Sequence, residues 1–412
     1  MKILHLSTTD KKGGAGIAAY RLHKGIINNG VKSQMFVQRK YGETGDVFCS
    51  KNIFRKLYDF SCFAADKTIA VISGPRGYEI TSPALFASMN LKIIDELKPD
   101  IVHIHWICGG FLSPEKIAKI KKPIVWTFHD MWPFSGINHL NDSNKDYISG
   151  NFKNNNFLDK WTWERKKRSW KNLNNLTVVS PSKWLANEAK SSYLFRNFRI
   201  ENIPNGIDTN VFKECDKLLS KKKYGLPLDK KLLLFGAANP LSNERKGYKL
   251  LISVIQKLLE SKINKNLALV IFGSANKKMG FGLPTYFIGE VSSEKDLAEI
   301  YSAADIFITP SREDNLPNTV IESMSCGTPV VAFNIGGMPD MIDNKVNGVM
   351  VAPFKVNLMA REISLILNNK KYHKSLSIGA RRKVLRKFNI NLVVKKYCRL
   401  YESILNINKI TK

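Results

Sequence analysis

The segment from Ser311 to Val331 has the pattern of a turn, a short helix and a buried strand in succession. Two carboxylates, Asp314 and Glu322, are separated by seven residues, and a helical pattern starts near Thr319. A turn that leads into a helix N-terminus offers unpaired N–H groups to a phosphate. A carboxylate one turn into such a helix can accept hydrogen bonds from ribose hydroxyls. The pattern predicts a nucleotide-diphosphate site. The alternative is an acidic surface turn before an ordinary core helix.

Short apolar runs alternate with helical patterns along most of the chain, which is typical of doubly wound α/β sheets. A chain of 412 residues is also too long for one core, so we expect two such domains, 1–205 and 206–384. The predicted strands are Lys2–Ser7, Ser33–Val37, Ile101–His105, Ile124–Phe128, Leu176–Ser180, Arg199–Ile203, Leu232–Gly236, Ala268–Phe272, Tyr286–Ile288, Ile306–Thr309, Val330–Phe333 and Val349–Val351. The predicted helices include Gly16–Asn29, Tyr248–Ser261, Lys295–Ala303, Thr319–Ser325 and a long basic helix, Arg381–Leu405.

Composition limits the classes of protein to which this chain can belong. Hydrophobic residues make up 44% and charged residues 24%, as in globular proteins, and no apolar run approaches the roughly 20 residues of a membrane span. The first apolar run is too short for a signal peptide, so we expect a cytoplasmic protein. The six cysteines are widely spaced without a C-x-x-C pair, which fits neither a zinc site nor a disulfide framework.

The net charge of +29 indicates an anionic partner, because 64 basic residues face 35 acidic ones. Nucleic acid, an anionic membrane face and an anionic substrate are the three candidates. The chain lacks the usual nucleic-acid-binding patterns, so we expect no nucleic acid partner. Bias toward Lys and Asn in the composition would also produce part of this excess.

Glycines follow the first predicted strand directly, at Gly13, Gly14 and Gly16. Glycines there let the backbone approach a pyrophosphate at the start of a helix. The spacing differs from the G-x-G-x-x-G fingerprint, and Gln38 and Arg39 stand where a nicotinamide-binding protein has an acidic residue. The pattern therefore favours a diphosphate site without a nicotinamide cofactor.

These motifs together resemble the retaining glycosyltransferases of family 4, whose signature is E-x7-E before a helix that runs into CGTPVV. Asp314 stands where that family usually has its first Glu, and Glu322 matches the second. The stretches GGAGIAAYRLH, HDMWPF and EDNLPNTVIE are most similar to the exopolysaccharide and colanic-acid type of enzyme. The resemblance implies the GT-B fold: two Rossmann-like domains facing a central cleft, with the last segment, 385–412, crossing back onto the first domain.

The resemblance also implies a role for each matching residue. The donor would be a nucleotide-diphosphate sugar and the acceptor a glycan, lipid-linked at the inner membrane face. The residues implied in the donor site are Gly14, Gly16, Arg245, Lys246, Asn315, Leu316, Pro317, Asn318 and Glu322, and those implied in catalysis are His129, Asp314 and Lys246. Family members often carry an Arg where this chain has Ala237, and Arg245 would compensate. Without the resemblance, the Arg-Lys-Gly turn would be a solvated loop and His129 would equally be a structural histidine.

No Asp-x-Asp motif occurs in the chain, so we expect neither a catalytic metal nor a cofactor. No covalent nucleophile is expected. We expect His103 and His105 to face opposite sides of their strand and to support His129 from behind.

Five consecutive charged residues lie between tryptophans in the segment from Trp161 to Trp170. Tryptophan with basic residues favours a lipid headgroup layer or a surface that stacks on sugar rings, and a solvated helix face is the alternative. For the whole chain, two rivals to glycosyl transfer remain: a nucleotide-sugar 2-epimerase on the same fold, and a non-catalytic basic scaffold that binds polyanions.

Overall fold

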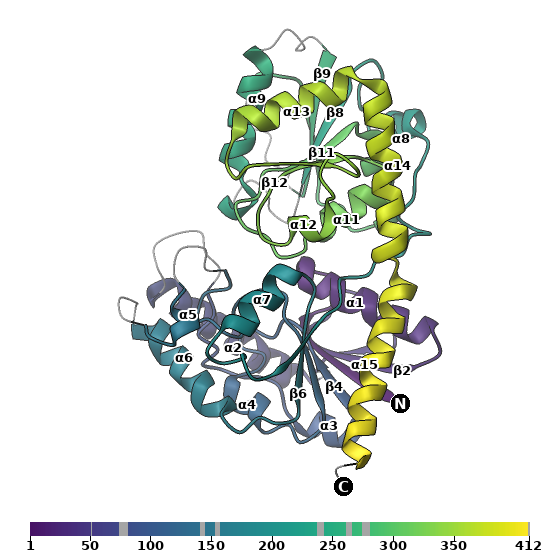
Figure 1. The fold of residues 1–412 in the computed structure, drawn as a ribbon. Helices are drawn as coiled ribbons and strands as arrows, with labels where there is room; N and C mark the ends of the chain where they lie inside the picture. Colours follow the sequence, from purple (N-terminus) through teal and green to yellow (C-terminus); the bar gives the residue numbers. More distant parts are fainter. Residues whose placement is uncertain are drawn as a thin grey trace. The chain divides into compact units, whose positions relative to one another are not determined.

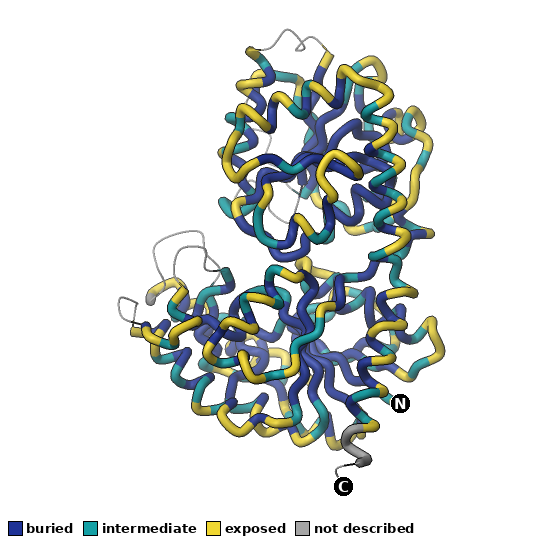
Figure 2. The backbone as a smooth tube through the Cα atoms, in the orientation of Figure 1, coloured by how far each residue is buried: buried dark blue, intermediate teal, exposed yellow. Residues whose placement is uncertain are grey.

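The computed structural model describes residues 1–50, 52–73, 81–140, 145–152, 157–236, 243–260, 266–273 and 281–410 (Figure 1). The chain divides into two compact units, one formed by Met1–Gly206 with Asn391–Lys412 and the other by Ile207–Ile390. In each unit the strands form a buried centre and the exposed backbone lies on helices and loops (Figure 2).

The described residues of the first unit form a parallel sheet of seven strands in the order β3-β2-β1-β4-β5-β6-β7. Its strands are β1 Lys2–Thr9, β2 Lys32–Arg39, β3 Val47–Phe48, β4 Ile101–Ile104, β5 Ile124–Thr127, β6 Leu176–Ser180 and β7 Arg199–Asn202. Its helices are α1 Gly13–Asn28, α2 Ile53–Ser73, α3 Lys92–Leu97, α4 Pro114–Ala118, α5 Asp146–Ser149, α6 Phe157–Trp170, α7 Lys183–Ser191 and α15 Ile390–Ile410.

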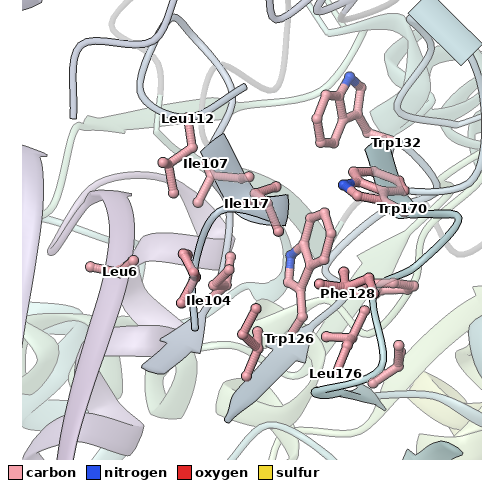
Figure 3. Packing of buried hydrophobic residues seen from close by; sticks show 14 of the residues in the cluster. Leu6, Ile104, Ile107, Leu112, Ile117, Trp126, Phe128, Trp132, Trp170 and Leu176 are labelled. Atoms are coloured by element: carbon pink, nitrogen blue, oxygen red, sulfur yellow. The ribbon is translucent and has the colours of Figure 1, made fainter. Parts of the chain in front are cut away.

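Alternation along β1 separates two kinds of side chain onto the two faces of this sheet. Leu4 and Leu6 belong to the main apolar core, in which Trp126 of β5 packs edge-on against Trp170 of α6 at 5.4 Å between ring centroids (Figure 3). His5 lies between these two leucines in the sequence, so it points to the opposite face. One face of the sheet is therefore apolar and the other presents a buried polar group.

The described part of the second unit contains a parallel sheet of six strands in the order β10-β9-β8-β11-β12-β13. Its strands are β8 Lys231–Gly236, β9 Leu267–Phe272, β10 Thr285–Gly289, β11 Ile306–Thr309, β12 Val330–Phe333 and β13 Val349–Val351. Its helices are α8 Lys217–Lys223, the 3-10 turn η1 Glu244–Lys246, α9 Tyr248–Glu260, α10 Glu294–Ala303, α11 Asn318–Ser325, α12 Met338–Met341, α13 Val356–Asn368 and α14 Lys370–Lys387.

Both faces of this second sheet are buried under helices. Leu232 and Leu234 of β8 pack in one cluster with α10, α11 and α14, whereas Leu233 and Phe235 pack in another with α9 and α13. Continuous apolar runs such as Leu232–Phe235 are what a parallel strand covered on both faces requires. The predicted class, two doubly wound α/β sheets, is confirmed.

Two predicted helix boundaries are wrong. The first helix begins at Gly13 rather than near Gly16, so the glycines form its first turn instead of a preceding loop. The long C-terminal helix is two helices, α14 and α15, because the chain breaks where the backbone N–H of Ile207 binds the carbonyl of Phe388 at 2.8 Å. The buried Phe388 side chain belongs to the second unit's core, which fixes the end of α14 there.

No helix among the described residues is long and apolar enough to cross a membrane.

Candidate functional site

Two cations and a carboxylate meet at the carboxyl ends of strands in the second unit. Arg245 and Lys246 lie on η1, which comes after β8, and Asp314 lies between β11 and α11. Lys246 Nζ is 2.6 Å from Asp314 Oδ2, and an Arg245 guanidinium nitrogen is 3.3 Å from Oδ1. Ligands of open α/β sheets bind at this edge of the strands. The structure therefore brings three of the predicted site residues into one cluster.

Backbone contacts hold these two turns together. The N–H of Arg312 donates to the carbonyl of Arg245 at 2.8 Å. Gly247 has φ +74°, and a Cβ at this position would lie 1.8 Å from the carbonyl oxygen of Pro310. Only glycine permits such an approach and such a backbone angle. The glycine of the Arg-Lys-Gly motif is thus required for the geometry of the cluster.

The cluster is partly desolvated, with 15% of the Lys246 side chain and 30% of the Arg245 side chain exposed. Burial by itself would raise the pKa of Asp314, but Lys246 and Arg245 outweigh burial and hold this pKa below its ordinary value. Burial lowers the pKa of Lys246, and the Asp314 carboxylate opposes this only in part. Asp314 is therefore ionised, and its two oxygens fix the positions of the two cations.

The predicted phosphate segment, Asn315 to Asn318, leads directly into α11. Pro317 takes the N-cap position with an extended backbone, and its side chain supplies no capping hydrogen bond. Asn315 and Leu316 are buried, and Leu316 belongs to an apolar core cluster. Leu316 can therefore contribute to a donor site only through its backbone.

Glu322 lies one turn further along α11 and is 4% exposed. The hydroxyl of Tyr301, which is fully buried on α10, donates to Glu322 Oε2 at 2.9 Å. This tyrosine was missed in the sequence, where it looks like one more apolar position of a core helix. The Tyr301 hydroxyl therefore gives Glu322 a hydrogen bond within the protein, in addition to any contact that Glu322 makes with a ligand. Ala237 lies outside the described residues.

His129 of the first unit follows β5 and ends a chain of buried imidazoles. His129 Nε2 is 3.3 Å from His105 Nδ1, and His105 Nε2 is 2.9 Å from His5 Nδ1. Burial lowers the pKa of His129 to about 4, although Asp130 opposes the shift. His129 is therefore a neutral hydrogen-bonding group at neutral pH, and its neighbour His105 helps to orient its ring.

Asp130 anchors the turn that carries His129. Asp130 Oδ2 is 2.6 Å from His139 Nδ1 and accepts a hydrogen bond from Trp106 Nε1 at 3.0 Å, while the N–H of Trp132 donates to Oδ1 at 3.0 Å. Burial would raise the pKa of Asp130, but His139 outweighs burial and the pKa is lowered. An ionised carboxylate thus holds the turn through three partners.

The expectation that His103 and His105 face opposite sides of their strand is wrong. Residues two apart on a strand share a face, and these two imidazoles stack at 4.2 Å between centroids. His103 Nδ1 is 2.7 Å from the hydroxyl of Tyr401, and its Nε2 is 2.8 Å from Thr127 Oγ1. The last helix, α15, therefore closes this face of the sheet with a tyrosine that sequence analysis did not single out.

Among the described residues, one group of histidines has the spacing of a three-histidine metal site. Its members are His5, His103 and His105, whose ligand nitrogens lie within 4.8 Å of one another. Hydrogen bonds use both nitrogens of His103 and join His5 to His105. The geometry is that of a hydrogen-bonded cluster, and a metal would have to replace these bonds.

The two glycines predicted to approach a diphosphate have different surroundings. A Cβ on Gly16 would lie 2.4 Å from Thr9 Oγ1 and 3.0 Å from the Thr9 carbonyl, so Gly16 is needed for α1 to pack against the end of β1. Around a Cβ on Gly14 there is nothing within 4 Å. Gly14 is therefore the one with space for a ligand beside it.

The basic tryptophan-rich segment from Trp161 to Trp170 lies only partly at the surface, and its centre is neither lipid-facing nor solvated, contrary to those two expectations. Lys166 is fully buried and donates to the carbonyls of Ser135 at 3.1 Å and Gly136 at 2.6 Å. Arg165 is 8% exposed and pairs with Glu115 at 2.8 Å. Trp163 and Trp170 are buried as well. These cations hold the loops of the first unit in place.

Two protein-family models match the chain in succession. Residues 12–211 match Glycosyltransferase Family 4, and residues 216–383 match Glycosyl transferases group 1. Among solved structures, sucrose-phosphate synthase of Thermosynechococcus elongatus has a TM-score of 0.70 at 17% identity, covering 99% of this chain and 100% of that one. The Anabaena protein HepE, solved with UDP and glucose, has a TM-score of 0.65 at 16% identity, covering 98% and 100%. These likenesses show a shared fold, the GT-B arrangement of two Rossmann-like domains.

Each half of the chain thus matches a glycosyltransferase family model. The first half matches as a family 4 domain and the second half as a group 1 domain. A D-inositol 3-phosphate glycosyltransferase of Streptosporangium roseum is 24% identical over 301 residues, which are 68% of this chain and 64% of that relative. The chain spans less than two thirds of the length of the first curated relatives that it matches.

Proposed function

We propose that this chain transfers a hexose from a nucleotide-diphosphate sugar to a glycan acceptor, with the anomeric configuration retained. The observation that supports this most directly is the cluster of Arg245, Lys246 and Asp314 beside the N-terminus of α11. Two cations beside a helix N-terminus suit the negative charge of a departing diphosphate.

The proposed chemistry depends on charge that develops as the sugar–phosphate bond breaks. Lys246 and Arg245, held on Asp314, would neutralise the departing diphosphate, a role that a divalent metal has in other enzymes. Interactions that strengthen only as this charge grows raise the rate rather than the affinity. Glu322 would bind the ribose hydroxyls from one turn inside α11.

The first unit would receive the acceptor. From the same unit, His129, which lies beside His105, would contact a hydroxyl of the donor sugar, and Gly14 leaves space for the donor at the start of α1. The net charge of +29 favours an acceptor held at an anionic membrane, such as a lipid-linked glycan of surface polysaccharide synthesis at the cytoplasmic face.

Incubation with a panel of UDP-, GDP- and dTDP-sugars tests the proposal. The release of the free nucleoside diphosphate is measured with and without EDTA. UDP-glucose comes first, because the Anabaena protein of the same fold was solved with UDP and glucose. We expect one donor to be consumed, with release stimulated by a glycan acceptor and insensitive to EDTA. Epimerisation of the sugar without an acceptor would assign the chain to the 2-epimerases, and absence of any nucleotide binding would leave a polyanion-binding scaffold.

The anomeric configuration of the product, measured by NMR, tests retention separately. An inverted product would contradict that part of the proposal and leave the donor assignment intact.

A further inference from the structure

Helix α2 of the first unit has one face fixed against the protein. Asp59, Cys62, Asp66 and Ala70 are all buried, and their spacing of three and four residues places them on one side of the helix. The N–H of Leu85 donates to Asp66 Oδ1 at 3.2 Å. This side of α2 is therefore the inner one.

Close backbone packing fixes the rotation of α2 about its axis. Gly110 has φ +71°, and a Cβ there would lie 2.5 Å from the carbonyl oxygen of Cys62. The side-chain amide of Gln38 also donates to the carbonyl of Asp59 at 3.4 Å. Because these contacts use the backbone of α2 itself, the opposite side of the helix must face outward.

The outward side of α2 is apolar and exposed. Phe54 is 78% exposed, Leu57 58% and Phe60 68%, and the same side continues through exposed residues at the two ends, Ile53, Val71 and Ile72. Monomeric proteins rarely expose several large apolar side chains together, as Phe54, Leu57 and Phe60 are here, without a partner for them.

The charges of α2 are divided between its two sides. Both carboxylates of the helix, Asp59 and Asp66, are buried on the inner side. Lys56 and Lys67 are exposed, so the charge that α2 presents to solvent is positive. An apolar row flanked by lysines, on a helix that exposes no carboxylate of its own, complements a surface that is apolar beneath a layer of negative charge.

We propose that the outward side of α2 docks the first unit on an anionic lipid bilayer. The helix would lie in the interface with Phe54, Leu57 and Phe60 inserted below the headgroups and Lys56 and Lys67 at the phosphates. None of the described helices can span a membrane, which agrees with attachment from one side. This inference deepens the proposed function, because a lipid-linked acceptor lies in the same bilayer.

Vesicle flotation tests the proposal, with phosphatidylcholine vesicles that contain or lack phosphatidylglycerol. The apolar variant is Phe54→Ser/Leu57→Ser/Phe60→Ser, and the charge variant is Lys56→Ser/Lys67→Ser. We expect the parent to bind the anionic vesicles and the apolar variant to lose at least about tenfold in partitioning. Each lysine removed should weaken binding about fivefold at low salt, and this loss should fade as salt increases.

Helix α8 of the second unit supplies a matched control. Its Leu218 and Leu219 are 58% and 64% exposed beside several lysines, but the helix has only seven residues. We expect Leu218→Ser/Leu219→Ser to bind vesicles as the parent does. All substituted residues are exposed, so circular dichroism should show unchanged folding in the three variants.

Four results would overturn the proposal: a parent that does not bind anionic vesicles, an apolar α2 variant that binds as well as the parent, an α8 variant that loses as much, or a parent dimer that becomes a monomer in the apolar variant. The last result would assign the patch to a second copy of the chain. Diphosphate release with a soluble acceptor is measured on the same variants and should not change. If vesicle binding is as expected but no donor is consumed, the proposed function fails and the docking surface remains.

Discussion

Lowering the pH from about 7.5 to about 5 should destabilise the first unit, because its buried histidines are held neutral. Burial lowers the pKa of His23 and of His129 from 6.5 to about 4. Burial also lowers the pKa values of His5, His103 and His105 well below 6.5. In each case the unfolded chain binds the proton first. The stability that these groups contribute is therefore present above pH 6.5 and is lost as the pH falls from 6.5 toward 4.

The size of the effect follows from about 1.4 kcal/mol for each pKa unit. A pH of about 5 is some 1.5 units below the pKa of histidine in the unfolded chain. At this pH, His23 and His129 should each lower the free energy of unfolding by about 2 kcal/mol, or about 4 kcal/mol together. Asp66 opposes this, because burial raises its pKa to about 6 and the folded state takes up its proton first. That offset is about 1.4 kcal/mol at the same pH. The net loss is roughly 3 kcal/mol, and the contributions of His5, His103 and His105 would add to it. This is a large part of the typical free energy of unfolding, about 5–15 kcal/mol.

Tryptophan fluorescence measures this loss in the first unit alone. All seven tryptophans lie between Trp106 and Trp184, within that unit, and His373 is the only histidine of the second unit. Urea unfolding followed by fluorescence should give a free energy of unfolding that falls steadily below about pH 6.5. The variant His129→Asn should lose about 2 kcal/mol less than the parent by about pH 5. A stability that stays constant from pH 7.5 to 5, or an unchanged slope in the variant, would refute neutral burial of these histidines.

Five further substitutions test single residues. Lys246→Ala should lower turnover roughly hundredfold with a smaller change in the Michaelis constant, because its charge acts on the departing diphosphate; full turnover with only a raised Michaelis constant would contradict this. Glu322→Ala should weaken nucleotide binding, measured by calorimetry, and cost about 1–3 kcal/mol of stability. Tyr301→Phe should cost stability without weakening nucleotide binding, and equal weakening in both variants would remove Glu322 from the ribose site. Gly16→Ala should destabilise the first unit by about 1–3 kcal/mol through overpacking. Gly14→Ala should leave the stability of this unit unchanged or higher. Gly14→Ala should reduce donor turnover only if a ligand contacts Gly14.

Much of the fold was predictable from the sequence, because it depends on local periodicity. The strands Leu176–Ser180, Ile306–Thr309, Val330–Phe333 and Val349–Val351 have the predicted bounds, and the other predicted strands differ by one or two residues at their ends. Apolar runs of four to six residues between turn-forming residues indicate buried parallel strands without any knowledge of tertiary contacts. The break between α14 and α15 was missed, because it depends on a hydrogen bond between Ile207 and Phe388, which are far apart in the chain.

The candidate site was predictable as a set of residues but not as a geometry. The family resemblance indicated Arg245 and Lys246, and the spacing of two carboxylates indicated Asp314. The structure shows the three residues in one ion-paired cluster. The contact of Glu322 with Tyr301 was invisible in the sequence, because a tyrosine in a core helix resembles any other apolar position.

The sequence by itself determined most of the strands, the class of fold and the residues from which a phosphate site can be built, since each follows from patterns within a few neighbouring residues. Only the tertiary structure decided which charges are buried. Lys166 and Arg165, in a segment that suggests a basic surface, lie inside the first unit because carbonyl groups and Glu115 from distant loops pair with them. The apolar row from Phe54 to Phe60 lies outside, because the backbone of α2 packs on Gly110. Burial depends on which segments meet in space, and no local pattern records that.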